Sequence, residues 1–326
     1  MMNIFVTYRC NLDCPYCFAR QLRDEFPGDM DKETFERLLG WMAQANVPSV
    51  AFIGGEPTLH PRLPEMLEQT AMAGISPVLF TNGLFPEGLA SRLAPHVANV
   101  VVNYNEPQTY GAGQWERLHA NLDALAALRV RLTFSKNFSR QTPRYDYLLQ
   151  GAERYAVRAI RYDISRPAAD CANTYVSLDE TREIMASLVH FVKECEAMGV
   201  RTGLDCSVRF CDVRNEDRQY LERVSAKFTG ICHPSIDIHP NLSASYCLPL
   251  HGVRVPDVTR FADQDALRWH FAQMVRPMRL ENVSASCLDC KDFMRRCQGG
   301  CLALRRAAPC DTERCAIELP EAVTHE

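Results

Sequence analysis

The stretch Met2-Asn-Ile-Phe-Val-Thr-Tyr-Arg-Cys10-Asn-Leu-Asp-Cys14-Pro-Tyr-Cys17 begins with a short apolar run at residues 4–7 and then places three cysteines close together. The apolar run contains β-branched residues and predicts a strand. The C-x3-C-x2-C pattern comes directly after it, so it predicts a loop at the carboxyl end of that strand. Folds built from parallel strands place their chemistry in such loops.

Strand and helix patterns alternate beyond this stretch. Runs with strand character follow at residues 50–53, 78–81, 100–103, 130–135 and 159–163. Helical patterns separate them, for example an N-cap at Asp31 followed by Phe35, Leu38 and Met42 on one face. Six such units predict an α/β fold with parallel strands and right-handed crossovers. A complete barrel needs eight units, so we expect a partial (β/α)6 TIM-like barrel.

The regular alternation of strand and helix patterns ends after residue 166. A long helix is predicted at 178–198, closed by Gly199, and one more strand pattern follows at 202–208. From about residue 230 the chain is rich in cysteine and shows little periodicity, as is typical of small regions that need metal or disulfide links. We therefore expect a barrel domain at residues 1–225 and a small Cys-rich, cluster-binding domain at 226–326.

Fifteen cysteines in a chain without a recognisable secretion signal indicate metal or redox chemistry rather than disulfides. Three thiolates on one loop can hold three irons of a 4Fe–4S cluster and leave the fourth iron open for catalysis. Two other interpretations of Cys10, Cys14 and Cys17 are a zinc site and three buried thiols. Zinc sites usually draw on Cys or Cys/His pairs, and no histidine lies near this loop.

The loop and four later motifs resemble the signature of the radical S-adenosylmethionine (SAM) superfamily. Tyr16 precedes the last cysteine as in that family, and Gly54-Gly55-Glu56 resembles the motif that hydrogen-bonds the amino group of SAM. Polar residues at the next three strand ends match positions where the family contacts SAM. These cofactor-binding candidates are Thr81, Asn82, Asn103, Asn105, Ser135 and Lys136. Relatives often carry Ser-x-Asp where this chain has Asn103 and Asn105, and an ordinary strand-end turn is the alternative role for each residue.

The resemblance implies a reaction as well as a fold. An electron from the reduced cluster cleaves SAM, and the resulting 5′-deoxyadenosyl radical abstracts hydrogen from a substrate. A flavodoxin- or ferredoxin-type protein is the expected electron donor. The chain itself is expected to position the substrate and exclude water.

The C-terminal cysteines resemble the SPASM domain, an auxiliary-cluster extension of radical SAM peptide maturases. The resemblance implies that Cys232, Cys247 and Cys301 bind an inner 4Fe–4S cluster. It also implies an outer cluster on Cys287, Cys290 and Cys297, closed by Cys310 or Cys315. Only two cysteines precede the long gap, so the inner cluster either keeps an open iron or takes another ligand such as His233 or His239. The alternative is a structural zinc ribbon, since the spacings are near those of zinc sites.

Three further residues are candidate catalytic groups: Cys206 as a proton or hydrogen-atom donor, and Asp163 and Asp205 as acid or base near the substrate. Each also has a simpler interpretation. A buried cysteine often serves as a small apolar residue, and a strand-end aspartate often forms a cap or an ion pair.

Composition limits the classes of partner. Forty acidic residues against 36 basic ones give a net charge of −4, which argues against nucleic-acid binding. No apolar run is long enough to span a bilayer, so no membrane association and a cytoplasmic location are expected.

The favoured function is oxidative modification or crosslinking of a ribosomally made peptide. Because the motif begins at Cys10, no leader-binding module is expected before it, and a separate protein would present the peptide. One alternative is dehydrogenation, epimerisation or decarboxylation of a small molecule such as an amino sugar or nucleoside. A zinc-stapled binding protein without enzymatic activity is the other.

Overall fold

The computed structural model describes residues 1–140 and 143–307. Within these ranges one mixed sheet runs through the molecule in the order β11-β10-β9-β1-β2-β3-β4-β5-β6-β7-β8. Its strands are β1 (Met2–Phe5), β2 (Ser49–Ile53), β3 (Ser76–Thr81), β4 (Asn99–Asn103), β5 (Leu132–Phe138), β6 (Ala159–Ile164), β7 (Arg201–Leu204), β8 (Ser225–Ala226), β9 (Asp237–Ile238), β10 (Ala244–Ser245) and β11 (Arg254–Val255). Strands β1 to β8 pair in parallel, each with the next. Strand β9 pairs in parallel with the other edge of β1.

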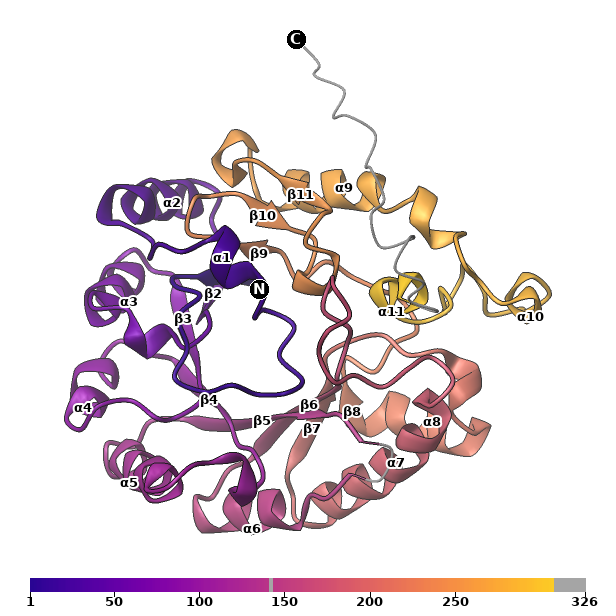
Figure 1. Ribbon diagram of the computed structural model, residues 1–326, viewed down its shortest axis with the longest axis horizontal. Coiled ribbons are helices and arrows are strands. Elements are labelled where there is room, and N and C mark those ends of the chain that lie inside the picture. The colour runs from indigo at the N-terminus through magenta and orange to yellow at the C-terminus, as the bar shows by residue number, and fades with distance from the viewer. Residues whose placement is uncertain (141–142, 308–326) are drawn as a thin grey trace.

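Helices cover the outer, convex face of this curved sheet (Figure 1). The longer ones are α2 (Lys32–Gln44), α3 (Leu63–Met72), α5 (Gln114–Ala127), α6 (Asp146–Arg154), α7 (Thr181–Ala197), α8 (Asn215–Val224) and α9 (Gln264–Met274). Four short helices complete the described set: α1 (Leu22–Glu25), α4 (Leu89–Leu93), α10 (Ala285–Leu288) and α11 (Leu302–Arg306). None of the helices in the described ranges is long and apolar enough to cross a membrane.

Local sequence explains where the helices begin and which face they bury. The Asp31 carboxylate accepts a hydrogen bond of 2.8 Å from the Thr34 amide, so the predicted N-cap of α2 is confirmed. Phe35, Leu38 and Met42 then point into the core and are fully buried. Their spacing of three and four residues keeps them on one face of the helix, which packs on the sheet.

The α/β class and the partial barrel are confirmed, and the six predicted strands of the barrel all form. The predicted seventh strand is β7, which pairs with β6 in parallel. The sheet is longer than the sequence indicated, because β8 extends it at one edge and β9–β11 extend it beyond β1. These additions are two-residue strands, too short to carry a periodic pattern.

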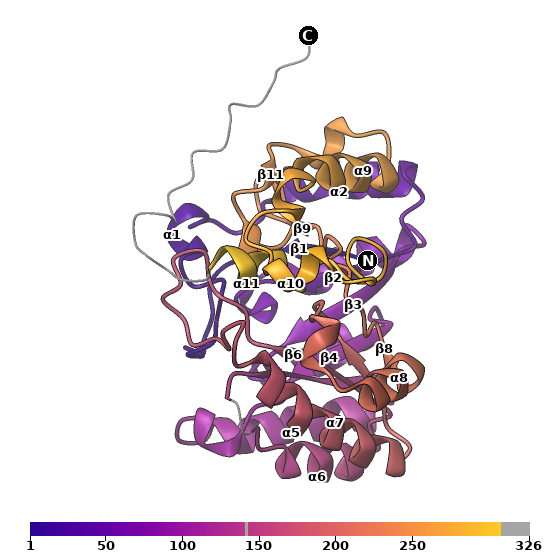
Figure 2. The same ribbon diagram turned by 90° about the vertical axis from the view of Figure 1, so that its right-hand side faces the viewer.

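The sheet crosses the predicted boundary at residues 225 and 226. Strand β9 pairs with β1 through Asn3 and Ile4, and the Asn3 side chain donates a 2.6 Å hydrogen bond to Asp237. Farther along, the Trp41 indole on α2 donates to the Phe261 carbonyl at 2.7 Å. Helices α2 and α9 both lie at the end of the molecule away from α5 and α6 (Figure 2). The C-terminal part therefore packs directly on the first βα unit of the barrel.

Candidate active site

The cysteine loop is held against the sheet by two glycines at the end of β2. The Gly55 amide donates to the Thr7 carbonyl at 2.9 Å, and the Glu56 amide donates to the Arg9 carbonyl at 2.7 Å. A Cβ atom on Gly54 would lie 2.3 Å from the Thr7 carbonyl oxygen, and one on Gly55 would lie 2.4 Å from that of Arg9. Glycine is needed at both positions because two stretches of backbone approach here without room for a side chain.

The carboxylate of Glu56 links the ends of β2 and β3. Its Oε1 accepts hydrogen bonds from the Thr58 hydroxyl at 2.6 Å and the Thr81 hydroxyl at 2.8 Å, and its Oε2 accepts one from the Asn82 amide at 2.7 Å. The side chain is fully buried, and burial raises the pKa of Glu56 in spite of these bonds. The carboxylate is thus a brace between strand ends, and contact with an amino group of SAM stays a prediction.

Asn82 connects the Glu56 carboxylate to the loop that carries Cys10. Its Nδ2 donates to Asn11 Oδ1 at 2.7 Å and lies 4.0 Å from the sulfur of Cys10. The Leu12 amide points at the same sulfur, 3.4 Å away. Burial raises the pKa of the Cys10 thiol to about 11. A thiol in this setting stays protonated at neutral pH until something such as a metal takes the place of the proton.

A second network joins the loop to β4 and β5. The Tyr16 hydroxyl donates to Asn105 Oδ1 at 2.5 Å and accepts from Asn103 Nδ2 at 3.1 Å. Lys136 Nζ lies 3.3 Å from the same Asn105 oxygen and 3.7 Å from the Glu106 carboxylate. Burial lowers the pKa of Lys136. Three residues predicted at successive strand ends, Asn103, Asn105 and Lys136, therefore meet around Tyr16.

The segment after β6 closes the other side of the loop. The Thr174 amide donates to the Pro15 carbonyl at 2.8 Å, and the Asn173 side chain donates to the Tyr16 carbonyl at 3.0 Å. Ser135 lies half-buried on β5, where its carbonyl accepts from the Tyr104 amide at 3.0 Å. No sequence motif marked residues 173 and 174, because their contact with the loop spans more than 150 positions.

The residues present fit a 4Fe–4S cluster with SAM. Cys10, Cys14 and Cys17 are half-buried free thiols on one loop, and Nδ2 of the buried Asn105 has no hydrogen-bond partner within the described residues. Such an unpaired amide suits a polar ligand. In residues 1–140 and 143–307, no three His, Cys, Asp or Glu side chains converge as ligands of a single ion would. The assignment to a cluster rests on the spacing of the thiols and on these surroundings.

The three predicted inner thiols lie near enough to one another to interact electrostatically. Cys247 interacts electrostatically with Cys232 and Cys301, and burial raises the pKa of Cys247 well above its usual value. The Tyr246 hydroxyl donates to the Cys232 carbonyl at 3.0 Å and lies 3.6 Å from its sulfur. His239, a candidate ligand, has both ring nitrogens hydrogen-bonded elsewhere, to Tyr8 and Ser245.

The predicted outer thiols lie on turns with one unforeseen neighbour. Cys287 interacts electrostatically with Cys297 and Cys290, and the Cys290 amide donates to the Cys287 carbonyl at 3.1 Å. Cys211, which follows β7, is exposed and interacts electrostatically with Cys287 and Cys297. The predicted closing ligands Cys310 and Cys315 lie outside the described residues.

The candidate catalytic groups lie at the ends of β6 and β7. Asp163 pairs with Arg166 at 3.5 Å, and Asp205 pairs with Arg161 at 2.5 Å and with Lys227 at 3.2 Å. The thiol of Cys206 lies within hydrogen-bonding reach of Asp163 and Arg166. Both aspartates thus form the ion pairs that sequence reasoning weighed against an acid/base role. Their participation in catalysis stays a prediction.

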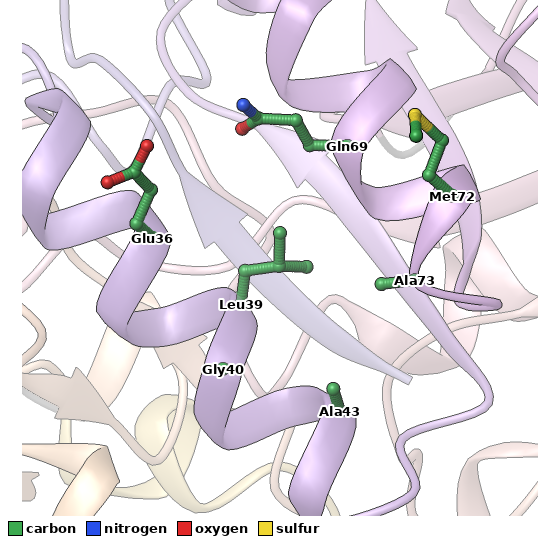
Figure 3. Close-up of a pocket in the computed structure, with 7 residues that line it drawn as sticks. All are labelled: Glu36, Leu39, Gly40, Ala43, Gln69, Met72 and Ala73. Atoms are coloured by element: carbon green, nitrogen blue, oxygen red, sulfur yellow. The ribbon is translucent and has the colours of Figure 1, made fainter.

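A shallow cavity of about 480 Å³ lies elsewhere, on the outside of the barrel between α2 and α3 (Figure 3). Its lining is largely apolar, with Leu39 on α2 and Met72 and Ala73 at the C-terminal end of α3 (Figure 3). The cysteines, Glu56 and Lys136 do not line it. It therefore contributes nothing to the candidate site.

Fold and loop together define a class: a partial-barrel protein with a three-thiol loop at the carboxyl edge of its parallel sheet. Residues 4–110 match the model of the radical SAM superfamily. The chain is 35% identical over 89 residues to Fe-coproporphyrin III synthase of Methanosarcina barkeri, which is 27% of this chain and 22% of that protein. It is 35% identical over 79 residues to PqqA peptide cyclase of Methylorubrum extorquens, 24% of this chain and 21% of the relative. The chain therefore matches only about a fifth of the length of these two relatives.

Solved structures extend the similarity to nearly the whole fold. Native anSMEcpe with bound AdoMet superposes with a TM-score of 0.67 at 19% identity, over 92% of this chain and 88% of that one. SuiB of Streptococcus suis bound to the precursor peptide SuiA gives 0.64 at 16% identity, over 93% and 71%. At such low identity these structures establish the fold alone. The family match covers the cysteine loop and the Gly54–Glu56 motif, so in this region the chain is similar to radical SAM proteins.

Proposed function

We propose that the chain is a radical SAM enzyme that cleaves SAM reductively, abstracts hydrogen from a ribosomally made peptide, and leaves the peptide oxidised or crosslinked. The observation that carries the first part is the brace from Glu56 through Asn82 to Cys10, which ties the cysteine loop to two strand ends. When bound, the cluster and SAM would supply the radical chemistry on thiolates from Cys10, Cys14 and Cys17.

The chain's own residues have three tasks in this proposal. Asn82 and the Leu12 amide direct hydrogen-bond donors at the Cys10 sulfur, which stabilises a thiolate there. Asn103, Asn105 and Lys136 form the polar wall on which SAM would lie, with Thr81 and Ser135 at neighbouring strand ends. The segment at residues 173 and 174 covers the loop and limits the access of water.

Peptide substrates are supported by proteins of the same fold. Complexes of anSMEcpe with the Cp18Cys peptide and of SuiB with the precursor peptide SuiA superpose on this chain. PqqA peptide cyclase shares part of the sequence. We further propose that Cys232, Cys247 and Cys301 hold one auxiliary cluster and Cys287, Cys290 and Cys297 a second, in a SPASM-like region. A flavodoxin- or ferredoxin-type donor and a separate leader-binding protein would complete the system.

The deciding experiment is anaerobic reconstitution followed by assay of iron, sulfide, zinc and 5′-deoxyadenosine formed from SAM and dithionite. The wild type should bind about eight to twelve irons, since each cubane holds four. A Cys10/Cys14/Cys17→Ala variant should lose about four irons and all deoxyadenosine. A Cys195→Ala variant is the control, because Cys195 is a buried thiol on α7. Zinc without deoxyadenosine in the wild type would leave a zinc-stapled binding protein.

The substrate is tested next by mass spectrometry. Incubation with short peptides encoded beside the gene should produce a loss of about two hydrogens that depends on SAM and on Cys10, as expected of a net two-electron oxidation. Modification of an amino sugar or nucleoside instead, with all peptides unchanged, would contradict the peptide assignment while leaving the radical SAM assignment intact.

A further inference from the structure

Cys206 lies where the barrel meets the inner thiol group. It follows β7 directly, and the Asp205 amide just before it donates to the Tyr162 carbonyl of β6 at 3.1 Å, so the strand pairing fixes its position. The Cys206 side chain interacts with the thiol of Cys301 as well as with Asp163 and Arg166. The residue before Cys301 packs beside the same chain segment, because a Cβ atom on Gly300 would lie 3.0 Å from Cγ of Arg209 and 3.7 Å from the carbonyl carbon of Val208.

Four thiols lie near enough to one another to interact electrostatically in pairs. Cys206 interacts with Cys301, Cys301 with Cys232, and Cys247 with both Cys232 and Cys301. They come from three separate parts of the fold: the end of β7, the segments on either side of β9 and β10, and the residue before α11. Four thiolates are the complement that closes a 4Fe–4S cluster.

Two buried guanidinium groups flank the same thiols. Arg166 and Arg305 are each only 2% exposed. Arg166 interacts with Cys206 and Cys301, and Arg305 interacts with Cys232 and Cys301. The Nε atom of each arginine has no hydrogen-bond partner among the residues that the structure describes. Buried cations with an unused donor are costly unless a negative group lies against them.

A cluster with four thiolate ligands would meet that need. It carries net negative charge, and its sulfur atoms accept hydrogen bonds. Asp163, paired with Arg166 at 3.5 Å, offsets one of the two positive charges. Arg305 donates through its other nitrogens to the carbonyls of Glu281, Met278 and Arg279, and none of these carries charge. The charge balance of this region therefore calls for an anion between the two arginines.

We propose that Cys206 is the fourth protein ligand of the auxiliary cluster held by Cys232, Cys247 and Cys301, so that none of its irons is open to substrate. On coordination the Cys206 S–H bond breaks, an iron–sulfur bond forms, and the proton leaves to solvent. This inference rests on the auxiliary cluster in the proposed function. It excludes a role for Cys206 as hydrogen-atom donor, because a ligating thiolate has no hydrogen to give, and it assigns the cluster to electron transfer.

The test separates this cluster from the one at the SAM site. In a Cys10/Cys14/Cys17→Ala background only auxiliary iron remains, and Cys206→Ala and Cys206→Ser are added to it. The background should show about eight irons and no three-iron signal by electron paramagnetic resonance (EPR) after mild oxidation with ferricyanide. Each Cys206 variant should release one iron on the same oxidation and give a three-iron signal. Added β-mercaptoethanol should suppress this signal in Cys206→Ala by replacing the missing ligand.

Controls keep the result interpretable. Cys195→Ala in the same background removes a buried thiol with no partner among the proposed ligands, and its iron content and EPR signal should match the background. Circular dichroism checks that the variants fold, and Cys206→Ser covers a folding failure of Cys206→Ala. Oxidation-resistant clusters in both Cys206 variants would overturn the inference alone. A background without iron would overturn it together with the auxiliary clusters, while deoxyadenosine formation by the wild type tests the SAM site separately.

Discussion

The two cysteine regions of this chain are built in opposite ways. The loop at Cys10–Cys17 is fixed by backbone hydrogen bonds to strand ends and by the saturated carboxylate of Glu56. The C-terminal thiols lie among two-residue strands and short turns, with buried arginines that lack full hydrogen bonding. The first region is thus held in place by hydrogen bonds to the sheet. The second has little regular structure of its own, so we infer that its order depends on what its thiols hold.

Removal of iron should give the largest difference in amide exchange between the two regions. After chelation under reducing conditions, we expect amide exchange at residues 230–307 to rise by orders of magnitude, because metal binding and folding are coupled in such regions. Exchange in β2 to β6 should change little, since these longer strands pair with one another in a continuous parallel sheet. Hydrogen exchange with mass spectrometry measures both regions in one sample. Equal protection before and after chelation would show that the C-terminal region is ordered by its own packing.

The glycine contact gives the next largest effect. Gly55→Ala places a Cβ atom 2.4 Å from the Arg9 carbonyl oxygen and 2.5 Å from that of Tyr8, so the cysteine loop must move. We expect a loss of about 3 kcal/mol in the free energy of unfolding, as for severe overpacking, and reduced cluster binding at the SAM site. Gly40→Ala is the matched control, because its Cβ would meet nothing within 4 Å on helix α2. That change should be neutral or stabilising by up to about 1 kcal/mol.

The Glu56 brace is the third test. Glu56→Gln replaces a carboxylate oxygen by an NH₂ group facing donors from Thr58, Thr81 or Asn82, and we expect a loss of about 2 kcal/mol. Glu65→Gln removes a carboxylate that pairs with Arg62 on the surface of α3 and should cost well under 1 kcal/mol. Chemical denaturation of both variants gives the comparison. Equal losses in the free energy of unfolding for the two variants would mean that the hydrogen bonds of Glu56 do not stabilise the strand ends.

Sequence reasoning succeeded where the structure repeats and missed contacts made across long distances. Thr81, Asn82 and Asn105 lie at strand ends as predicted, because parallel strands bring their carboxyl ends to one edge, and their contact with SAM stays a prediction. Strand β9 was missed, because two residues carry no periodicity. The approach of Cys206 and Arg166 to Cys301 was missed as well, since only the closed fold brings positions so far apart in the chain together.

The smallest expected effect is on the pH dependence of the free energy of unfolding. It arises at β9, where the C-terminal region pairs with β1. On β9, burial raises the pKa of Asp237 to about 6, from an ordinary value of 3.8, and lowers that of the nearby His239 to about 3, from 6.5. Between about pH 4 and 6, folded Asp237 keeps a proton that the unfolded chain has lost, so rising pH lowers stability. Folded His239 lacks a proton that the unfolded chain holds, so rising pH increases stability. The two slopes oppose each other and should nearly cancel in the wild type.

Removing either titrating group should leave the pH dependence caused by the other one uncompensated. Relative to wild type, Asp237→Asn should add a slope of about +1.4 kcal/mol per pH unit to the free energy of unfolding, because only the histidine term remains. His239→Phe keeps a ring in the stack on Phe26 and should add a slope of similar size and opposite sign. Guanidinium unfolding at several pH values, read as the difference from wild type at each pH, isolates these terms from other titrating groups. Slopes of the same sign would contradict the burial of one of the two side chains, and with it the packing of β9 on β1 that joins the cysteine-rich region to the barrel.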